Sequence, residues 1–179
     1  MAESLGSGRS TRVECSTMRA EWQLLCFAAL SRMPRPNKDA VAAAERVRAI
    51  YRELEARPVE RACDRRGECC HFKLTGRTPF LTAGEALVAA KALRGTGRKK
   101  LPERADGACP LLDPAAGRCL IYDARPFGCR THFCAAAGGP YARREVVDLI
   151  HRLEQVDAEL GGTGARALPV AVEQALGKL

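Results

Sequence analysis

Apolar residues recur every three or four positions in several stretches of the chain, which is the spacing of one face of a helix. These stretches predict helices over residues 18–33, 38–56, 83–93, 141–160 and 170–176. Pro34 and Pro36 end the first helix and Pro58 ends the second, because proline cannot donate the backbone hydrogen bond that a helix interior needs. Gly161 and Gly162 follow the fourth helix and favour its termination.

Two of the predicted helices carry the clearest apolar stripes. The stripe on residues 38–56, with Asn37 as its candidate N-cap, consists of Val41, Ala44, Val47, Tyr51 and Leu54. The stripe on residues 141–160 consists of Val146, Leu149, Ile150, Leu153 and Val156. Such stripes face a hydrophobic core far more often than a functional site, so we expect both helices to pack on a core. Before the third helix, Thr82 followed by Glu85 is a capping box, which predicts a helix start at Ala83.

A hairpin is predicted in the second half of the chain. Two short apolar runs, 109–112 and 118–122, flank residues 113–117, whose Asp, Pro and Gly favour a turn. Asp123 is then expected to cap a short helical turn that extends to Phe127.

The length of 179 residues suffices for one domain. We predict a mainly α fold: a small single domain whose helices frame an irregular, metal-stapled, cysteine-rich centre containing a short β-hairpin. The regions are a disordered tail (1–17), N-terminal helices (18–60), a cysteine-cluster metal-binding core (61–134) and C-terminal helices packing on that core (135–179). The longest apolar run, 24–30, is too short to cross a bilayer and no signal-peptide layout is present, so we expect a cytoplasmic protein without membrane contact.

The basic excess of the chain coincides with its cysteines. The net charge is +8, and residues 61–134 alone hold 14 Lys and Arg against 7 Asp and Glu. This excess could neutralise nucleic-acid phosphates, or it could compensate the charge of several thiolates around a metal. No aromatic stacking platform or recognition-helix pattern accompanies it, so we favour compensation over nucleic-acid binding.

Seven of the nine cysteines are clustered, and they indicate a metal centre. The clustered residues are Cys63, Cys69, Cys70, Cys109, Cys119, Cys129 and Cys134. Cytosolic thiols stay reduced, and thiolates select zinc, iron–sulfur clusters or copper(I). Only Cys129 and Cys134 have the short spacing of a zinc knuckle, so the irregular pattern favours an iron–sulfur cluster, with 4Fe–4S preferred, and leaves zinc open. We expect Cys15 and Cys26, far upstream, to be packed free thiols.

Several segments carry motifs that belong together. They are Cys63–Cys70, Leu81–Glu85, Cys109–Leu112, Gly117–Tyr122, Arg125–Pro126 and Cys129–Arg130. Over about residues 61–134 this combination resembles the YkgJ-like cysteine-cluster family, whose members are described as zinc- or iron-chelating or iron–sulfur proteins. The resemblance implies that the clustered cysteines hold a metal ion or cluster, and that Arg125 and Arg130 lie beside this cofactor. Four ligands suffice for one zinc or one cubane cluster, so either some of the seven cysteines are packing residues or two metals are held.

One residue departs from the first motif of that family, C-x-x-C-x-x-C-C. Arg66 stands where the second cysteine is expected, and Cys134 could supply the missing sulfur. His71 and His132 also have ligand-compatible spacings, although we favour a surface or capping role for both. Arg125 is expected to pair with a carboxylate or to cap carbonyls near the centre.

Three functions remain open at this stage. The first is a metal-binding protein without catalysis of its own, such as a chelator, a carrier or an interaction module with a protein partner. The second is an iron–sulfur redox or accessory protein for a protein-modification enzyme, because the resemblance extends to modules found in a methylase. The third is a zinc-stabilised nucleic-acid-binding module. No catalytic triad, dinucleotide fingerprint or carboxylate pair is recognisable, and the sequence does not decide whether the protein is an enzyme.

Overall fold

The computed structural model describes residues 38–179 apart from 59, 60, 62, 64 and 66. The expectations for residues 1–37 lie outside the described residues. They are the disordered tail, the helix over 18–33, the Asn37 cap and the packed thiols at Cys15 and Cys26.

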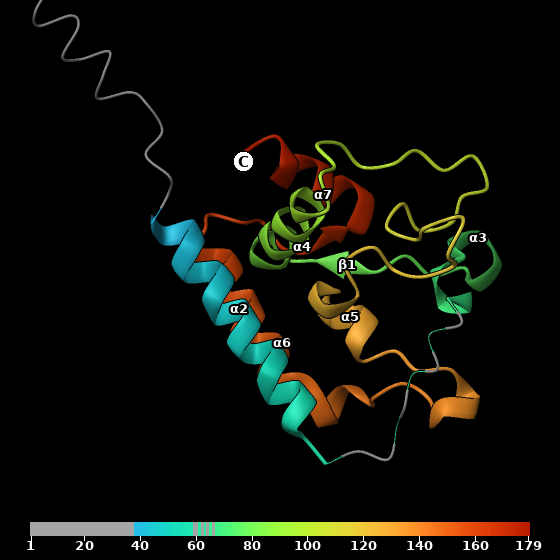
Figure 1. Cartoon of the computed structure of the whole chain (residues 1–179). Coiled ribbons are helices and arrows are strands. Elements are labelled where there is room, and N and C mark those ends of the chain that lie inside the picture. Colours follow the sequence, from blue (N-terminus) through green and yellow to red (C-terminus); the bar gives the residue numbers. More distant parts are fainter. Residues whose placement is uncertain (1–37, 59–60, 62, 64, 66) are drawn as a thin grey trace, which may run out of the picture. The chain divides into compact units, whose positions relative to one another are not determined.

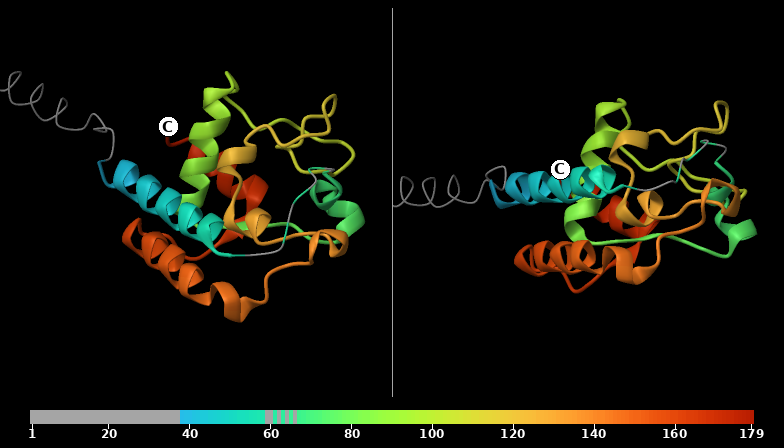
Figure 2. Two further views of the ribbon diagram at one scale, coloured as in Figure 1. Left: turned by 60° about the horizontal axis from the view of Figure 1, so that its bottom comes forward. Right: turned by 90° about the horizontal axis from the view of Figure 1, so that it is seen from below.

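The two striped helices lie side by side in the structure. They are α2 (Lys38–Ala56) and α6 (Arg143–Glu159), and both views of Figure 2 show them running alongside each other. Their stripes meet in one core cluster, as the sequence predicts. The residues that they bury there include Ala44, Val47, Tyr51, Leu54, Val146, Leu149, Leu153 and Val156.

Two positions of the predicted stripes need correction. Val41 is 51% exposed, because the buried face of α2 runs through Ala43 and Ile50 instead. Ile150 packs against the same core cluster but is only half-buried.

α4 (Ala83–Gly95) is the central helix and packs against α2, α6 and α7 (Leu168–Leu176). The predicted capping box is confirmed. The Thr82 hydroxyl accepts a hydrogen bond from the Glu85 amide at 3.5 Å, and the Thr82 amide donates to the Glu85 carboxylate at 3.0 Å. α7 begins two residues earlier than predicted and packs fully, with side chains from both of its turns in the core.

Gly84 allows this central helix to approach its neighbours closely. A Cβ at this position would lie 2.9 Å from the side chains of both Val47 on α2 and Val156 on α6. The crossing of three helices therefore depends on a residue without a side chain.

A small antiparallel sheet connects the starts of α4 and α7. It consists of β1 (Phe80–Leu81) and β2 (Arg166–Ala167), with Phe80 opposite Ala167. The sequence predicts neither strand, because two residues are too few for an alternating pattern to be recognised.

The remainder of the described chain is irregular, and Figure 2 shows these segments gathered on one side of the long helices. Its short elements are η1 (Glu68–Cys70), α3 (Phe72–Thr75), η2 (Tyr122–Ala124), α5 (Phe127–Arg130) and η3 (Ala135–Ala137). The helical turn predicted to extend to Phe127 is wrong in that detail. It ends at Ala124, because Arg125 and Pro126 adopt extended backbone angles before α5 begins.

The predicted hairpin is present in a reduced form. A single antiparallel bridge joins Leu112 to Cys119, and the turn between them is held by Asp113, whose carboxylate accepts hydrogen bonds from the amides of Ala115 and Ala116. The hairpin thus serves as a compact corner and not as a pair of extended strands.

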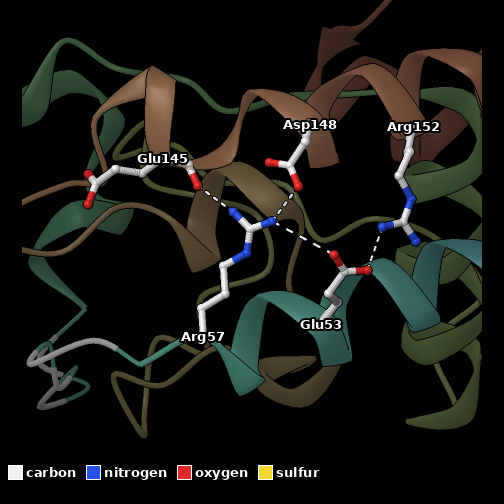
Figure 3. A network of polar contacts seen from close by, with 5 residues as sticks. All are labelled: Glu53, Arg57, Glu145, Asp148 and Arg152. Atoms are coloured by element: carbon white, nitrogen blue, oxygen red, sulfur yellow. Dashed lines mark hydrogen bonds and ion pairs between the residues drawn. The ribbon is translucent and has the colours of Figure 1, made fainter.

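Charged side chains link α2 to α6 at the surface (Figure 3). Arg57 at the end of α2 donates to the Asp148 carboxylate and to the Glu145 carbonyl, and it lies 3.8 Å from the Glu53 carboxylate. Glu53 in turn accepts a hydrogen bond from Arg152. Because these groups are largely exposed, the network adds to a contact that apolar burial already makes.

The expected fold class is confirmed for residues 38–179, which form one small, mainly helical domain with a two-stranded antiparallel sheet. No helix in this described part of the chain is long and apolar enough to cross a membrane.

Candidate metal centre

Six of the seven clustered cysteines line one cavity of about 380 Å³, which we call the thiol cavity. They are Cys63, Cys69, Cys70, Cys109, Cys119 and Cys129. All are free thiols, contributed by the segment before α3, by both sides of the hairpin and by α5.

The first cysteine segment reaches the cavity through a tight backbone turn. Gly67 precedes η1 with φ +75°, and a Cβ there would lie 2.9 Å from the Gly117 carbonyl oxygen in the hairpin turn. The amide of Cys109 donates to the Cys70 carbonyl at 2.6 Å. The backbone therefore joins the first cysteine segment to the second before any metal is considered.

α5 brings Cys129 to the cavity, and a buried carboxylate fixes where this short helix begins. Glu85 accepts a hydrogen bond from the Phe127 amide at 2.8 Å and another from the Tyr51 hydroxyl at 3.2 Å. Burial raises the pKa of Glu85, while the hydrogen bonds to its carboxylate oppose that shift. The capping box pointed to Glu85 as a helix-start residue, but its long-range contacts are not visible in the sequence.

Four of the six cysteines form an inner group, Cys69, Cys109, Cys119 and Cys129, which we call the inner quartet. Every pair within it interacts electrostatically, since an ionised thiol at one position raises the pKa of another. Burial shifts the pKa values of Cys109, Cys119 and Cys129 more than the neighbouring thiols do. It raises the pKa of Cys109 to about 12 and also raises the pKa values of Cys119 and Cys129. These thiols are therefore protonated at neutral pH unless a cation binds them.

Cys69 and Cys70 behave differently from the rest. Cys70 donates a hydrogen bond to Cys69, which lowers the pKa of Cys69 to about 6, while the pKa of Cys70 is raised by the same contact and by burial. Cys69 is also exposed, so it is the thiol of the inner quartet that is already ionised at neutral pH and open to an arriving cation.

The donor set fits a thiophilic metal. As the side chains stand, no three Cys, His, Asp or Glu residues of the described chain converge on a single-ion site, and the thiols surround a space instead. Their sulfur chemistry nevertheless suits zinc or iron, so metal binding requires them to move inward.

Among the described residues, four arginines and no carboxylates line the thiol cavity: Arg65, Arg77, Arg118 and Arg125. Arg65 and Arg125 both lie over the Tyr122 ring, at 4.2 and 4.0 Å from its centroid. Among the described residues none of the four arginines forms an ion pair with a carboxylate, so the expected carboxylate partner of Arg125 is not found there.

Arg130 lies next to the site without lining the cavity. Its guanidinium donates to the Glu55 carboxylate and to the carbonyls of Asp123 and Arg125, and it lies 4.3 Å from the centre of the Tyr51 ring. These contacts hold the turn before α5 against α2.

Of the three remaining candidate ligands, Cys134, His71 and His132, one lines the thiol cavity and two do not. Cys134 is exposed, and the residues that line the thiol cavity do not include it or His71, which lies near Asp106. His132 does line the cavity, and its Nδ1 atom is buried without a hydrogen-bond partner. Burial and the nearby Arg77 lower the pKa of His132.

A second cavity of about 610 Å³ lies behind the first and contains two buried carboxylates, so we call it the carboxylate cavity. Glu85 and Asp157 line it, and Asp157 accepts hydrogen bonds from the amides of Ala83 and Gly164.

The sequence was compared with protein families, curated proteins and solved structures. The family model named CxxCxxCC, described as a "putative zinc- or iron-chelating domain", matches residues 62–150. The chain carries a domain of this family. The matched segment includes every cysteine of the thiol cavity, together with Glu85 and α5. No curated protein and no solved structure matches the chain.

Proposed function

We propose that this domain binds a zinc or iron centre through the thiolates of the inner quartet, with a 4Fe–4S cluster as the first candidate and zinc as the second. The observation that carries the proposal is the convergence of six thiols from three segments on one cavity, four of which interact pairwise. Four thiolates complete the ligand set of either centre. Cys63, which is exposed, and Cys70, which is half-buried, are then additional thiols of the cavity.

The size of the cavity is compatible with a cluster as well as with a single ion. Tetrahedral zinc holds its sulfurs about 2.3 Å from the metal, and a sphere of that radius encloses about 50 Å³. The thiol cavity, at about 380 Å³, is several times larger. The cavity therefore has room for a polynuclear centre, which is one reason to list the 4Fe–4S cluster first.

The cavity arginines support an anionic centre of either type. Four thiolates around a doubly positive ion or core leave a net charge of about −2. Arg65, Arg77, Arg118 and Arg125 line the cavity that would hold this charge, and no carboxylate of the described residues lines it with them. We therefore assign the basic excess to compensation of the centre, and we place Arg130 among the structural residues because its guanidinium is already engaged.

Metal analysis tests the proposal. Protein purified without oxygen should be brown, with a broad visible absorption band, four irons and four acid-labile sulfides per chain as expected for about one cubane cluster. A colourless protein with stoichiometric zinc would select the second candidate. A folded protein free of both metals would overturn the proposal.

Single cysteine variants test the ligand set. Cys129→Ser should abolish stoichiometric metal binding, whereas Cys134→Ser, which changes an exposed thiol outside the cavity, should retain it. Equal loss of metal in both variants would show instead that Cys134 supplies the sulfur missing at position 66, as the sequence suggested.

A further inference from the structure

One end of the thiol cavity contains no cysteine. It is formed by Arg77, Thr78, Pro79, Phe80 and His132, which we call the thiol-free end. It adjoins Cys129, because a Cβ on the preceding residue, Gly128, would lie 3.8 Å from the Cβ of Pro79. The proposed ligand set includes none of these five residues, and of the five only Arg77 was assigned a role, in balancing the charge of the centre.

His132 provides the first indication of a ligand at this end. Its Nδ1 is buried without a partner in the described structure, and buried polar atoms of proteins are nearly always hydrogen-bonded. His132 also lines the thiol cavity, so a ligand in the cavity would lie close to this imidazole. A ligand acceptor there would then satisfy it.

Arg77 provides the second indication. Arg77 lines the same end, and its positive charge lowers the pKa of the nearby His132. No carboxylate of the described residues forms an ion pair with Arg77. A group that accepts hydrogen bonds from a guanidinium and an imidazole together is an oxyanion.

Phe80 narrows the class of ligand further. Its side chain lines the cavity and is 61% exposed, which is unusual for an aromatic ring next to a largely buried core. The strand pairing of β1 fixes the backbone beneath it. The ring thus offers an apolar surface next to the two nitrogen donors.

We propose that the thiol-free end binds a small organic carboxylate, whose oxygens are held by Arg77 and His132 and whose carbon portion rests on Phe80. The ligand lies beside the metal centre, next to Cys129. The proposal goes beyond metal binding and does not depend on it, because none of the three residues belongs to the inner quartet.

Histidine NMR gives a direct test on the full chain as purified. The chain contains three histidines, and His71 and His151 lie outside the cavity lining, so they serve as internal controls. Titration with benzoate should shift the ring signals of His132 alone. Acetate should shift the same signals at higher concentration, since it has no aromatic portion to contact Phe80.

Three variants separate the contributions. Arg77→Ala should weaken benzoate binding by at least about tenfold, because a charge-assisted hydrogen bond is lost. Arg98→Ala removes the same charge from an exposed loop position outside the cavity and should bind benzoate as the parent does. Phe80→Ala should weaken benzoate binding while leaving acetate binding unchanged.

Three results would overturn the proposal. They are an unmoved His132 signal at saturating benzoate, equal weakening by Arg77→Ala and Arg98→Ala, and tighter binding of inorganic phosphate than of benzoate. Metal content measured on the same samples keeps the two proposals apart. Benzoate binding to a metal-free protein would leave this inference standing while the metal proposal fails, and a metal-loaded protein that ignores benzoate would show the reverse.

Discussion

The helical scaffold and the cysteine region of this domain are stabilised in different ways. The scaffold consists of α2, α4, α6 and α7, which bury apolar side chains in two clusters. The cysteine region, whose described residues are 63, 65, 67–80 and 104–139, contains one-turn helices, a reduced hairpin and backbone-to-backbone hydrogen bonds. Burial stabilises the scaffold by itself, whereas the cysteine region positions the cavity thiols together with four cavity arginines that form no ion pair with a described carboxylate.

This contrast indicates where a metal acts on stability. A centre bound by the inner quartet would join segments that bury a few apolar side chains, such as Leu111, Ile121 and Phe127, against the scaffold but contain no helix longer than four residues. The scaffold would retain its buried clusters in either state. We expect the two regions to respond differently to the same perturbations.

Metal removal should have the largest effect and should separate the regions. A structural metal can contribute about 10 kcal/mol or more to folding, and that contribution should act mainly on the cysteine region. Hydrogen exchange of the metal-loaded and the chelated protein measures this. Amides of residues 109–130 should lose protection while those of α4 and α6 keep it, and equal loss in both regions would contradict the distinction.

Glu85→Ala should have the second-largest effect, because Glu85 connects the two regions. The variant leaves the buried Phe127 amide and Tyr51 hydroxyl without their acceptor, which should cost about 3–5 kcal/mol in denaturant unfolding. Glu85→Gln keeps an acceptor oxygen and should cost much less.

The same pair of variants makes a pH prediction. Burial raises the pKa of Glu85, so the folded protein holds this proton more strongly than the unfolded chain. Stability should therefore fall as the pH rises above the usual glutamate pKa, and this part of the slope should be missing from Glu85→Gln. If stability changed with pH equally in both proteins, the pKa of Glu85 would be the same in the folded and the unfolded chain.

Two glycine substitutions should have intermediate effects, one in each region. Gly84→Ala places a methyl group 2.9 Å from Val47 and Val156, and Gly67→Ala places one 2.9 Å from the Gly117 carbonyl at a positive φ. Each should cost about 1–3 kcal/mol. The thermal midpoint should fall for Gly84→Ala with metal binding preserved, while Gly67→Ala should chiefly lower the metal content. Gly95→Ala, which meets no atom within 4 Å, is the control.

Arg57→Ala should have the smallest effect. It removes the exposed contacts to Asp148 and Glu53 but leaves the apolar α2–α6 interface intact. Arg57 holds the pKa of Asp148 below its usual range, so the contribution is present at neutral pH and is lost as the pH falls through that lowered pKa. Added salt should diminish the difference between variant and parent in urea unfolding, and a salt-independent difference would point to lost packing instead.

The sequence predicts the scaffold well because its helices repeat an apolar pattern over many residues. α2 has the predicted bounds, and the capping box at Thr82 fixes the start of α4. The β1–β2 pair was missed because each strand has two residues and its partner lies far along the chain. Val41 was misplaced because apolar character alone does not reveal which of two adjacent helix faces is covered.

The sequence predicts which types of residue form the site, but it does not predict where each of them lies. Cysteine count and spacing identify the thiols, yet they do not reveal that Cys134 lies outside the cavity and that His132 lines it. The direction of a side chain at the end of a one-turn helix depends on contacts such as that between Glu85 and Phe127, which lie 42 positions apart. Residues separated in this way leave no local signal in a single sequence.

The thiol cavity and the carboxylate cavity share two lining residues, Phe80 and Gly128, so each of these residues separates one cavity from the other. These two positions therefore govern the permeability of the domain interior. A smaller side chain at Phe80 would widen the connection between the two cavities, so that solvent in the carboxylate cavity would also reach the thiol cavity. A methyl group at Gly128, where the nearest atom is 3.8 Å away, would narrow that connection without displacing its surroundings.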